Sequence, residues 1–245
     1  MSIRITAATT ARILRQLTGD RRTIALILLV PTLLLTLLRY VMDSEPMIFD
    51  RVGLVMLGVF PFISMFLVTS VAMLRERTSG TLERMLTTPL HKLDLLLGYG
   101  IAFALAAAVQ AGLAATISYW LLGLDTLGGP WLIGGLAVAN AVLGVAVGLL
   151  LSAFATSEFQ AVQFMPAVVL PQMLLCGLIW PREEMVGWLQ GASEVMPLTY
   201  AVEALTEVGG HTSATGTMWF DLAVVLGVAL LALVLGAATL RRRTP

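Results

Sequence analysis

The sequence predicts an all-α membrane protein with six transmembrane helices, and its composition and its hydrophobic pattern both support this fold class. Of the 245 residues, 58% are apolar, whereas soluble domains contain roughly 45–50%. Six windows of about 20 mostly apolar residues, the length that crosses the hydrocarbon core as a helix, follow one another along the chain. These runs do not alternate with polar residues, so they do not fit the strands of a membrane β-barrel.

The expected spans alternate with segments of unequal charge. They cover residues 23–42, 51–74, 93–122, 131–155, 159–180 and 218–240. Twelve of the 15 Lys and Arg residues then fall on one side, in segments 1–22, 75–92 and 241–245. Because cytoplasmic flanks carry the excess of positive charge, we expect a multi-pass protein of the inner cell membrane with both termini in the cytoplasm.

Residues 1–22 are expected to form an amphipathic interfacial helix. A helical arrangement gathers arginines on one face and places apolar side chains on another, namely Ile3, Ala7, Leu14 and Leu17. Such a helix lies in the inner headgroup layer. The alternative is a basic segment that only fixes topology. We expect residues 1–245 to form a single transmembrane domain.

The inner segment 75–92, with the sequence RERTSGTLERMLTTPLHK, is unusually polar for this chain. Leu82, Met85 and Leu86 recur at helical spacing and form a small apolar ridge beside Glu83. Apolar anchors with a charged rim are typical of small protein interfaces. The pattern therefore predicts a short exposed helix that docks a cytoplasmic partner. The alternative is a solvated turn whose charges only enforce topology.

The ends of this predicted helix have their own signals. Pro89 disfavours a helical conformation at Thr88, so the helix is expected to end there. Gly80 is expected near its start, where a residue without a side chain lets another backbone approach closely.

Residues 181–217 form an outer segment that is too apolar for a simple loop. Two short helices that dip into the outer leaflet fit it better. Each has an apolar side, formed by Met185, Trp188 and Leu189 in the first and by Val202, Leu205 and Val208 in the second. Glu203 and Glu207 lie one turn apart, and like charges at this spacing indicate a solvated surface rather than a catalytic pair.

Two runs of residues resemble the type-2 ABC export permeases, the family of the daunorubicin-resistance permeases. The first is the inner-loop signature Glu76-Arg77, Gly80-Thr81-Leu82-Glu83 and Thr88-Pro89. The second is Pro197-Leu198-Thr199-Tyr200, which follows Trp188-Leu189-Gln190. Six spans with both ends inside also fit this family, so the similarity covers nearly the whole chain.

The resemblance implies a dimer, formed with a second copy or a related permease, in which each half holds a separate ATPase subunit through the inner loop, the coupling helix. ATP and Mg²⁺ would be bound by that ATPase, and this chain would carry no cofactor or metal. The residues assigned to ATPase coupling are Glu76, Arg77, Gly80, Thr81, Leu82, Glu83, Met85, Leu86 and Pro89. Those assigned to the outer segment are Trp188, Pro197, Tyr200 and Glu203.

Spans two and five flank the substrate route in the resembling family. The fifth expected span contains three Gln and two Pro, which are better placed against other helices or a cavity than in lipid. The second expected span contains flexible and aromatic apolar side chains, which suit a hydrophobic substrate. We assign the substrate path to Met56, Phe60, Met65, Phe66, Gln163 and Phe164. The alternative for each is ordinary packing. Such a lining suits an amphipathic or hydrophobic drug, lipid or polyketide.

Other residues are expected to join helices. Gly144 and Gly148 form a Gly-x-x-x-Gly pair, which permits close helix contact, here within one bundle rather than at a dimer seam. Gln110 and Asn140 could hydrogen-bond between helices in the same way.

The sequence lacks the motifs that are typical of the other function classes. The single Lys, Lys92, is not part of a phosphate-binding P-loop, so ATP hydrolysis is expected on another chain. Neither a Ser-His-Asp set nor a His-Glu-x-x-His motif occurs, which argues against an intramembrane enzyme. A transport permease is therefore expected, with the bilayer, an ATPase and a second permease as partners and no nucleic acid. A passive channel or membrane scaffold is the alternative.

Overall fold

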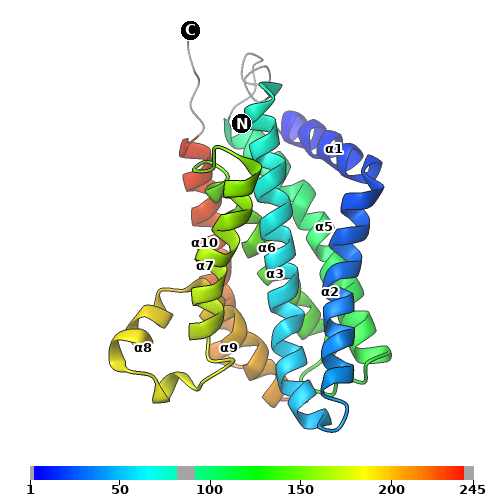
Figure 1. The fold of residues 1–245 in the computed structure, drawn as a ribbon, viewed down its shortest axis with the longest axis vertical. Helices are drawn as coiled ribbons and strands as arrows, with labels where there is room; N and C mark the ends of the chain where they lie inside the picture. Colours follow the sequence, from blue (N-terminus) through cyan, green and yellow to red (C-terminus); the bar gives the residue numbers. More distant parts are fainter. Residues whose placement is uncertain (1–2, 82–91, 240–245) are drawn as a thin grey trace.

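The computed structural model describes residues 3–81 and 92–239, and this part of the chain is helical with short connections and no strands (Figure 1). In chain order the helices are α1 (Ile3–Gly19), α2 (Arg21–Val41), α3 (Pro46–Thr78), α5 (Lys92–Trp120), α6 (Pro130–Leu151), α7 (Glu158–Leu175), the 3₁₀ helix η1 (Arg182–Glu184), α8 (Gly187–Glu194), α9 (Pro197–Gly210) and α10 (Gly216–Thr239). The all-α fold class is confirmed.

The long helices run side by side, and the short ones close the two ends (Figure 1). α1 lies across one end of the bundle, whereas α8 and α9 lie at the other. We call these the α1 end and the α9 end. The last turns of α10 return to the α1 end, so the first and last described helices meet the same side.

Five of the described helices are long and apolar enough to cross a membrane: α2, α3, α5, α6 and α10. The fifth expected span, residues 159–180, is represented by α7, which has 18 residues. Its three Gln and two Pro lower its hydropathy, and α7 is not among the five. α7 nevertheless runs along the bundle, because its first residue, Glu158, contacts the α1 end of α3 and Gln172, near its last turn, contacts the start of α9.

α3 is longer than the expected span 51–74. Its 33 residues correspond to about 50 Å, well beyond the roughly 30 Å of a hydrocarbon core. The additional turn at the α1 end includes Glu76 and Arg77, which were expected in a loop. In this turn Arg75 and Glu76 form ion pairs with Glu158 and Arg12 of neighbouring elements.

α3 and α6 form the centre of the bundle. On α6, Gly144 lies against the backbone carbonyl of Phe62, and a Cβ atom added to Gly148 would lie 2.5 Å from the carbonyl oxygen of Phe66. The glycine pair therefore packs inside the bundle, as expected. Gln110 of α5 donates a hydrogen bond to Ser64 of α3, which confirms one of the two predicted polar contacts.

Asn140 behaves differently from Gln110. Its side chain is buried and lies against Gly58 of α3, but its Nδ2 atom has no hydrogen-bond partner among the described residues. Its contact with α3 is therefore one of close packing rather than the predicted hydrogen bond.

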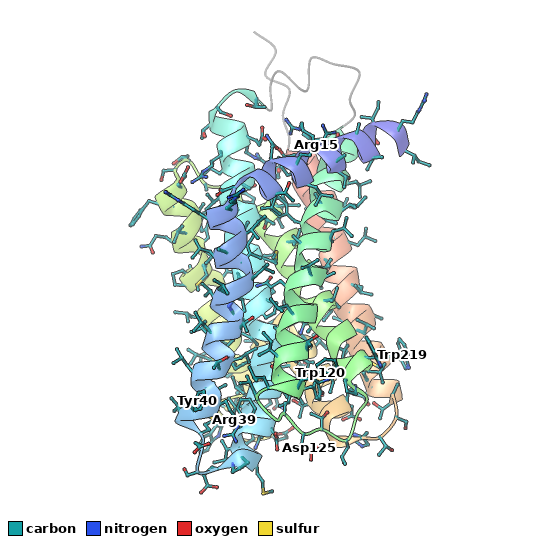
Figure 2. All side chains as sticks on the ribbon, turned by 90° about the vertical axis from the view of Figure 1, so that its right-hand side faces the viewer. Arg15, Arg39, Tyr40, Trp120, Asp125 and Trp219 are labelled. Carbon is teal, nitrogen blue, oxygen red and sulfur yellow. The ribbon has the colours of Figure 1, made fainter. Side chains whose placement is uncertain are left out.

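Aromatic side chains mark the α9 end on the outside of the bundle. Tyr40, Trp120 and Trp219 lie towards this end, and Arg15 lies at the other (Figure 2). The exposed fractions of the three aromatic residues are 71%, 88% and 56%. Exposed Trp and Tyr concentrate at membrane–water interfaces, which supports the assignment of a membrane protein.

The α3–α6 contact generates a stability prediction with a control on the same helix. We expect Gly148→Ala to lower the free energy of unfolding by about 1–3 kcal/mol, because the new methyl group forces the two backbones apart. Gly135→Ala meets no atom within 4 Å and should change it by no more than ~1 kcal/mol, towards greater stability. Thermal unfolding in detergent measures both, and equal melting temperatures would contradict this account of the contact.

Candidate functional site

The α1 end of α3 leads directly into the predicted coupling segment. α3 ends at Thr78, and Gly80 has a φ angle of +72°. A left-handed residue just beyond a helix favours glycine. A Cβ atom at Gly80 would meet nothing within 4 Å. The left-handed backbone conformation therefore explains why this residue is glycine. The expected close approach of another backbone to Gly80 does not occur within the described chain.

Glu76 turns towards the bundle rather than away from it. Its side chain is only 13% exposed, and its Oε1 atom lies 3.5 Å from Nη2 of Arg12 on α1. The same nitrogen donates a shorter hydrogen bond of 3.0 Å to the hydroxyl of Tyr99 on α5. Oε2 of Glu76 is buried without a partner among the described residues. Arg12 thus connects three helices.

Arg75 connects the same end of α3 to α7. Its Nε and Nη2 atoms donate hydrogen bonds of 2.8 and 3.1 Å to the two carboxylate oxygens of Glu158. This two-point geometry fixes the relative orientation of the partners as well as their distance. Both side chains are more than half exposed, so the pair contributes little to overall stability.

α1 is held on α5 by polar and close contacts. Thr6 donates a hydrogen bond of 3.4 Å to Asp94, and Thr10 donates one of 3.3 Å to the carbonyl of Gly98. A Cβ atom on Gly98 would lie 2.6 Å from the methyl group of Thr9. The face of α1 that meets the bundle is therefore formed mainly by threonines and Ile13, which the sequence reading did not identify.

The expected apolar face of α1 packs on the bundle only in part, through Leu14 and Leu17. Ile3 is 88% exposed and Ala7 is also exposed, whereas Thr6, Thr9 and Thr10 are buried. Because α1 lies across the bundle end, one side meets α5, and the described residues leave the part of the apolar side at Ile3 and Ala7 uncovered. An interfacial position in the membrane stays a prediction.

The rest of the predicted coupling set is only partly described. Leu82, Glu83, Met85, Leu86 and Pro89 lie outside the described residues. Thr81 Oγ1 lies 2.9 Å from the hydroxyl of Ser79. The Arg77 side chain is largely buried, and its Nε and Nη2 atoms have no hydrogen-bond partner in the ranges that the structure covers.

The residues assigned to the substrate path occupy two kinds of position. Met65 and Phe66 have no exposed surface and Met56 is 6% exposed, so all three pack within the bundle. Phe60 and Phe164 are partly buried, and Gln163 is exposed. The roles of all six stay predictions. In this arrangement only the last three reach the bundle surface.

Two other glutamines of α7 have structural partners. Gln160 accepts a hydrogen bond of 2.8 Å from the backbone of Thr156 at the start of α7. Gln172 is buried and its Oε1 accepts a hydrogen bond of 3.3 Å from the backbone N–H of Leu198, in the first turn of α9. The first N–H groups of a helix have no partner inside the helix, so Gln172 satisfies a donor that would otherwise be buried and unpaired.

The outer segment contains the two short helices that the sequence predicts. Pro197 is the first residue of α9, a position that proline favours because its missing N–H is not needed there. Tyr200 donates a hydrogen bond of 2.8 Å to the carbonyl of Glu194 at the end of α8. Trp188 of α8 is 72% exposed. The second motif is thus the start of α9 and its attachment to α8.

Arg182 connects the two short helices of the outer segment, α8 and α9. Its Nη1 atom lies 2.9 Å from Oε2 of Glu203 on α9, and its Nε donates a hydrogen bond of 3.1 Å to Ser193 on α8. The Glu203 side chain is 43% exposed, in agreement with the expected solvated surface, and the fold also brings Arg182, 21 residues away, to it. Glu207 lies 3.7 Å from Nδ1 of His211 instead.

Comparison with known proteins identifies the family. The family model described as "ABC-2 type transporter" matches residues 5–208. A "Probable multidrug ABC transporter permease YbhR" of Escherichia coli K12 is 26% identical over 160 residues, which are 65% of this chain and 44% of that protein. The "Linearmycin resistance permease protein LnrN" of Bacillus subtilis is 25% identical over 157 residues, 64% of this chain and 40% of that protein.

The similarity extends to a eukaryotic protein but covers only part of each relative. "ABC transporter G family member 20" of Dictyostelium discoideum is 23% identical over 141 residues, 58% of this chain and 19% of that protein. The matched region spans less than half the length of each of these relatives. The family match nevertheless covers most of the present chain, in agreement with the motifs at Glu76–Pro89 and Pro197–Tyr200. This chain belongs to the ABC-2 type transporter family of membrane permeases.

Proposed function

We propose that this chain is the transmembrane subunit of an ATP-binding-cassette exporter that moves an amphipathic or hydrophobic molecule, such as a drug, lipid or polyketide, out of the cell. ATP and Mg²⁺ are bound by a separate ATPase subunit, and a second copy or a related permease completes the membrane dimer. Both termini lie in the cytoplasm, which makes the α1 end the cytoplasmic end.

The observation that carries this proposal is the arrangement around the α1 end of α3. Residues 82–91 follow α3 directly, and Arg75 and Glu76, on its last turns, are joined to α7 and α1 by ion pairs. A displacement of the segment by an attached ATPase would therefore act on three helices at once. A solvated turn that only enforces topology would not require these ion pairs.

The relatives support the class of substrate. Two of them are named for multidrug transport and for linearmycin resistance. The described path candidates at the surface, Phe60 and Phe164, are aromatic. An apolar lining of this kind suits a hydrophobic or amphipathic cargo.

Partner binding provides the first test. We expect gentle extraction of the tagged chain to recover an ATPase that contains a P-loop, and Leu82→Asp to abolish this recovery because a carboxylate replaces an apolar anchor of the interface. Leu127→Asp places the same change in an exposed loop at the α9 end and should leave recovery intact. Mass spectrometry of the purified material measures both. Absence of any ATPase with the unmodified chain would favour a channel or scaffold.

The Arg75–Glu158 pair provides a test of transmission. We expect Arg75→Glu to lower the ATPase rate of the assembled complex by several-fold while changing thermal stability by less than ~1 kcal/mol, because the pair is exposed. The double exchange Arg75→Glu with Glu158→Arg should restore the rate, since the charges are paired again. Failure of the double exchange to recover any activity would contradict a role for this pair.

A further inference from the structure

A cavity at the α1 end combines an apolar wall with carboxylates. It has a volume of about 590 Å³, within the range of roughly 300–1,000 Å³ that is usual for small-molecule sites. Four helices, α1, α2, α3 and α5, contribute to it. Its apolar wall includes Leu26, Val68, Val71 and Phe103.

The charged groups of this cavity favour a cationic ligand. Its acidic residues are Asp20 and Glu76, and Arg75 is the basic residue among those that line it. Arg75 pairs with Glu158 and also interacts with Asp20, and Arg12 lies beside Glu76. Two guanidinium groups therefore face three carboxylates around the cavity. Hydrogen bonds from Thr23, the side chain first and then the backbone, lower the pKa of Asp20, which is therefore ionised at neutral pH.

Glu76 supplies the more buried carboxylate of the cavity, and the Tyr99 hydroxyl also interacts with it. The Oε2 atom of Glu76 has no hydrogen-bond partner within the described chain, and its Oε1 atom lies a long 3.5 Å from Arg12. The shorter bond of Arg12 goes to Tyr99. Because Arg12 balances the charge of Glu76 only at a distance of 3.5 Å, an ammonium group in the cavity would gain a favourable electrostatic interaction with this carboxylate.

We propose that this cavity binds an amphipathic molecule with a primary ammonium group, which Glu76 and Asp20 hold while the alkyl or ring portion lies against Val68, Val71 and Phe103. Together with the proposed export function, the site receives a cationic amphiphile from the leaflet at the α1 end before transport. This assigns Glu76, which the sequence motif places in the coupling set, to ligand recognition.

Cysteine protection tests the site without an ATPase. The chain contains a single Cys, Cys176, which is buried near the α9 end. In a Cys176→Ser background, Val71→Cys and, separately, Val68→Cys would be labelled with a maleimide dye in phosphatidylcholine nanodiscs. We expect dodecylamine to slow labelling at both positions by at least fivefold. Dodecanol, which has the same chain without the charge, should slow it less than twofold.

Two carboxylate variants test the recognition of the head group. Glu76→Gln should raise the dodecylamine concentration for half protection by about tenfold, the effect of losing one charge-assisted hydrogen bond. Glu183→Gln, an exposed residue at the α9 end, is the matched control and should leave it unchanged. Asp20→Asn, which affects an exposed residue, tests the second carboxylate even if Glu76→Gln folds poorly, and should weaken protection at least threefold.

The outcomes separate this site from the proposed function. Equal protection by dodecylamine and dodecanol, protection that survives both carboxylate changes, or no protection at either position would overturn the binding site and leave the export proposal standing. Protection that depends on the carboxylates, in a protein from which no ATPase is ever recovered, would support the site and overturn the export proposal. Thr206→Cys, which lies at the α9 end, should be labelled at the same rate with and without dodecylamine.

Discussion

The close contact between α3 and α6 is the constraint on which the other features of this protein depend. In a membrane, association of helices relies on packing and hydrogen bonds, because lipid tails are as apolar as the side chains. Gly144 and Gly148 let α6 approach the backbone of α3 at Phe62 and Phe66. With α3 fixed in the centre, α5 attaches through Gln110 and Ser64, and the remaining helices pack around this unit.

A central α3 also connects the two ends of the molecule. At the α1 end it extends beyond the length needed for the hydrocarbon core and carries Arg75 and Glu76, whose partners are on α7 and α1. α7 in turn reaches the first turn of α9 through Gln172. A series of contacts therefore leads from Arg75, at the start of the predicted coupling segment, through α7 to α9, and the contacts at both ends of α7 are directional hydrogen bonds.

The cavity beside α3 lies within the same set of contacts. Glu76 belongs both to its wall and to the polar group formed with Arg12 and Tyr99. A ligand that pairs with Glu76 would alter the contact between α3 and α1 next to the segment where an ATPase is proposed to bind. Coupling between the two requires that binding favours one of two arrangements of these helices. The long Arg12–Glu76 distance of 3.5 Å leaves room for such a change.

The sequence by itself determined the helical class, five of the six expected spans and the two family motifs, because long apolar runs can satisfy their backbone groups in lipid only as helices. It also predicted correctly that Gly144 and Gly148 permit close helix packing within the bundle. Only the tertiary structure decided which residues meet: Arg75 with Glu158, Arg182 with Glu203, and Gln172 with the start of α9. These partners are 83, 21 and 26 residues apart, and no local periodicity encodes such distances. Likewise the burial of Met65 and Phe66 and the inward turn of Glu76 follow from how helices pack against one another, which the pattern along a single helix does not specify.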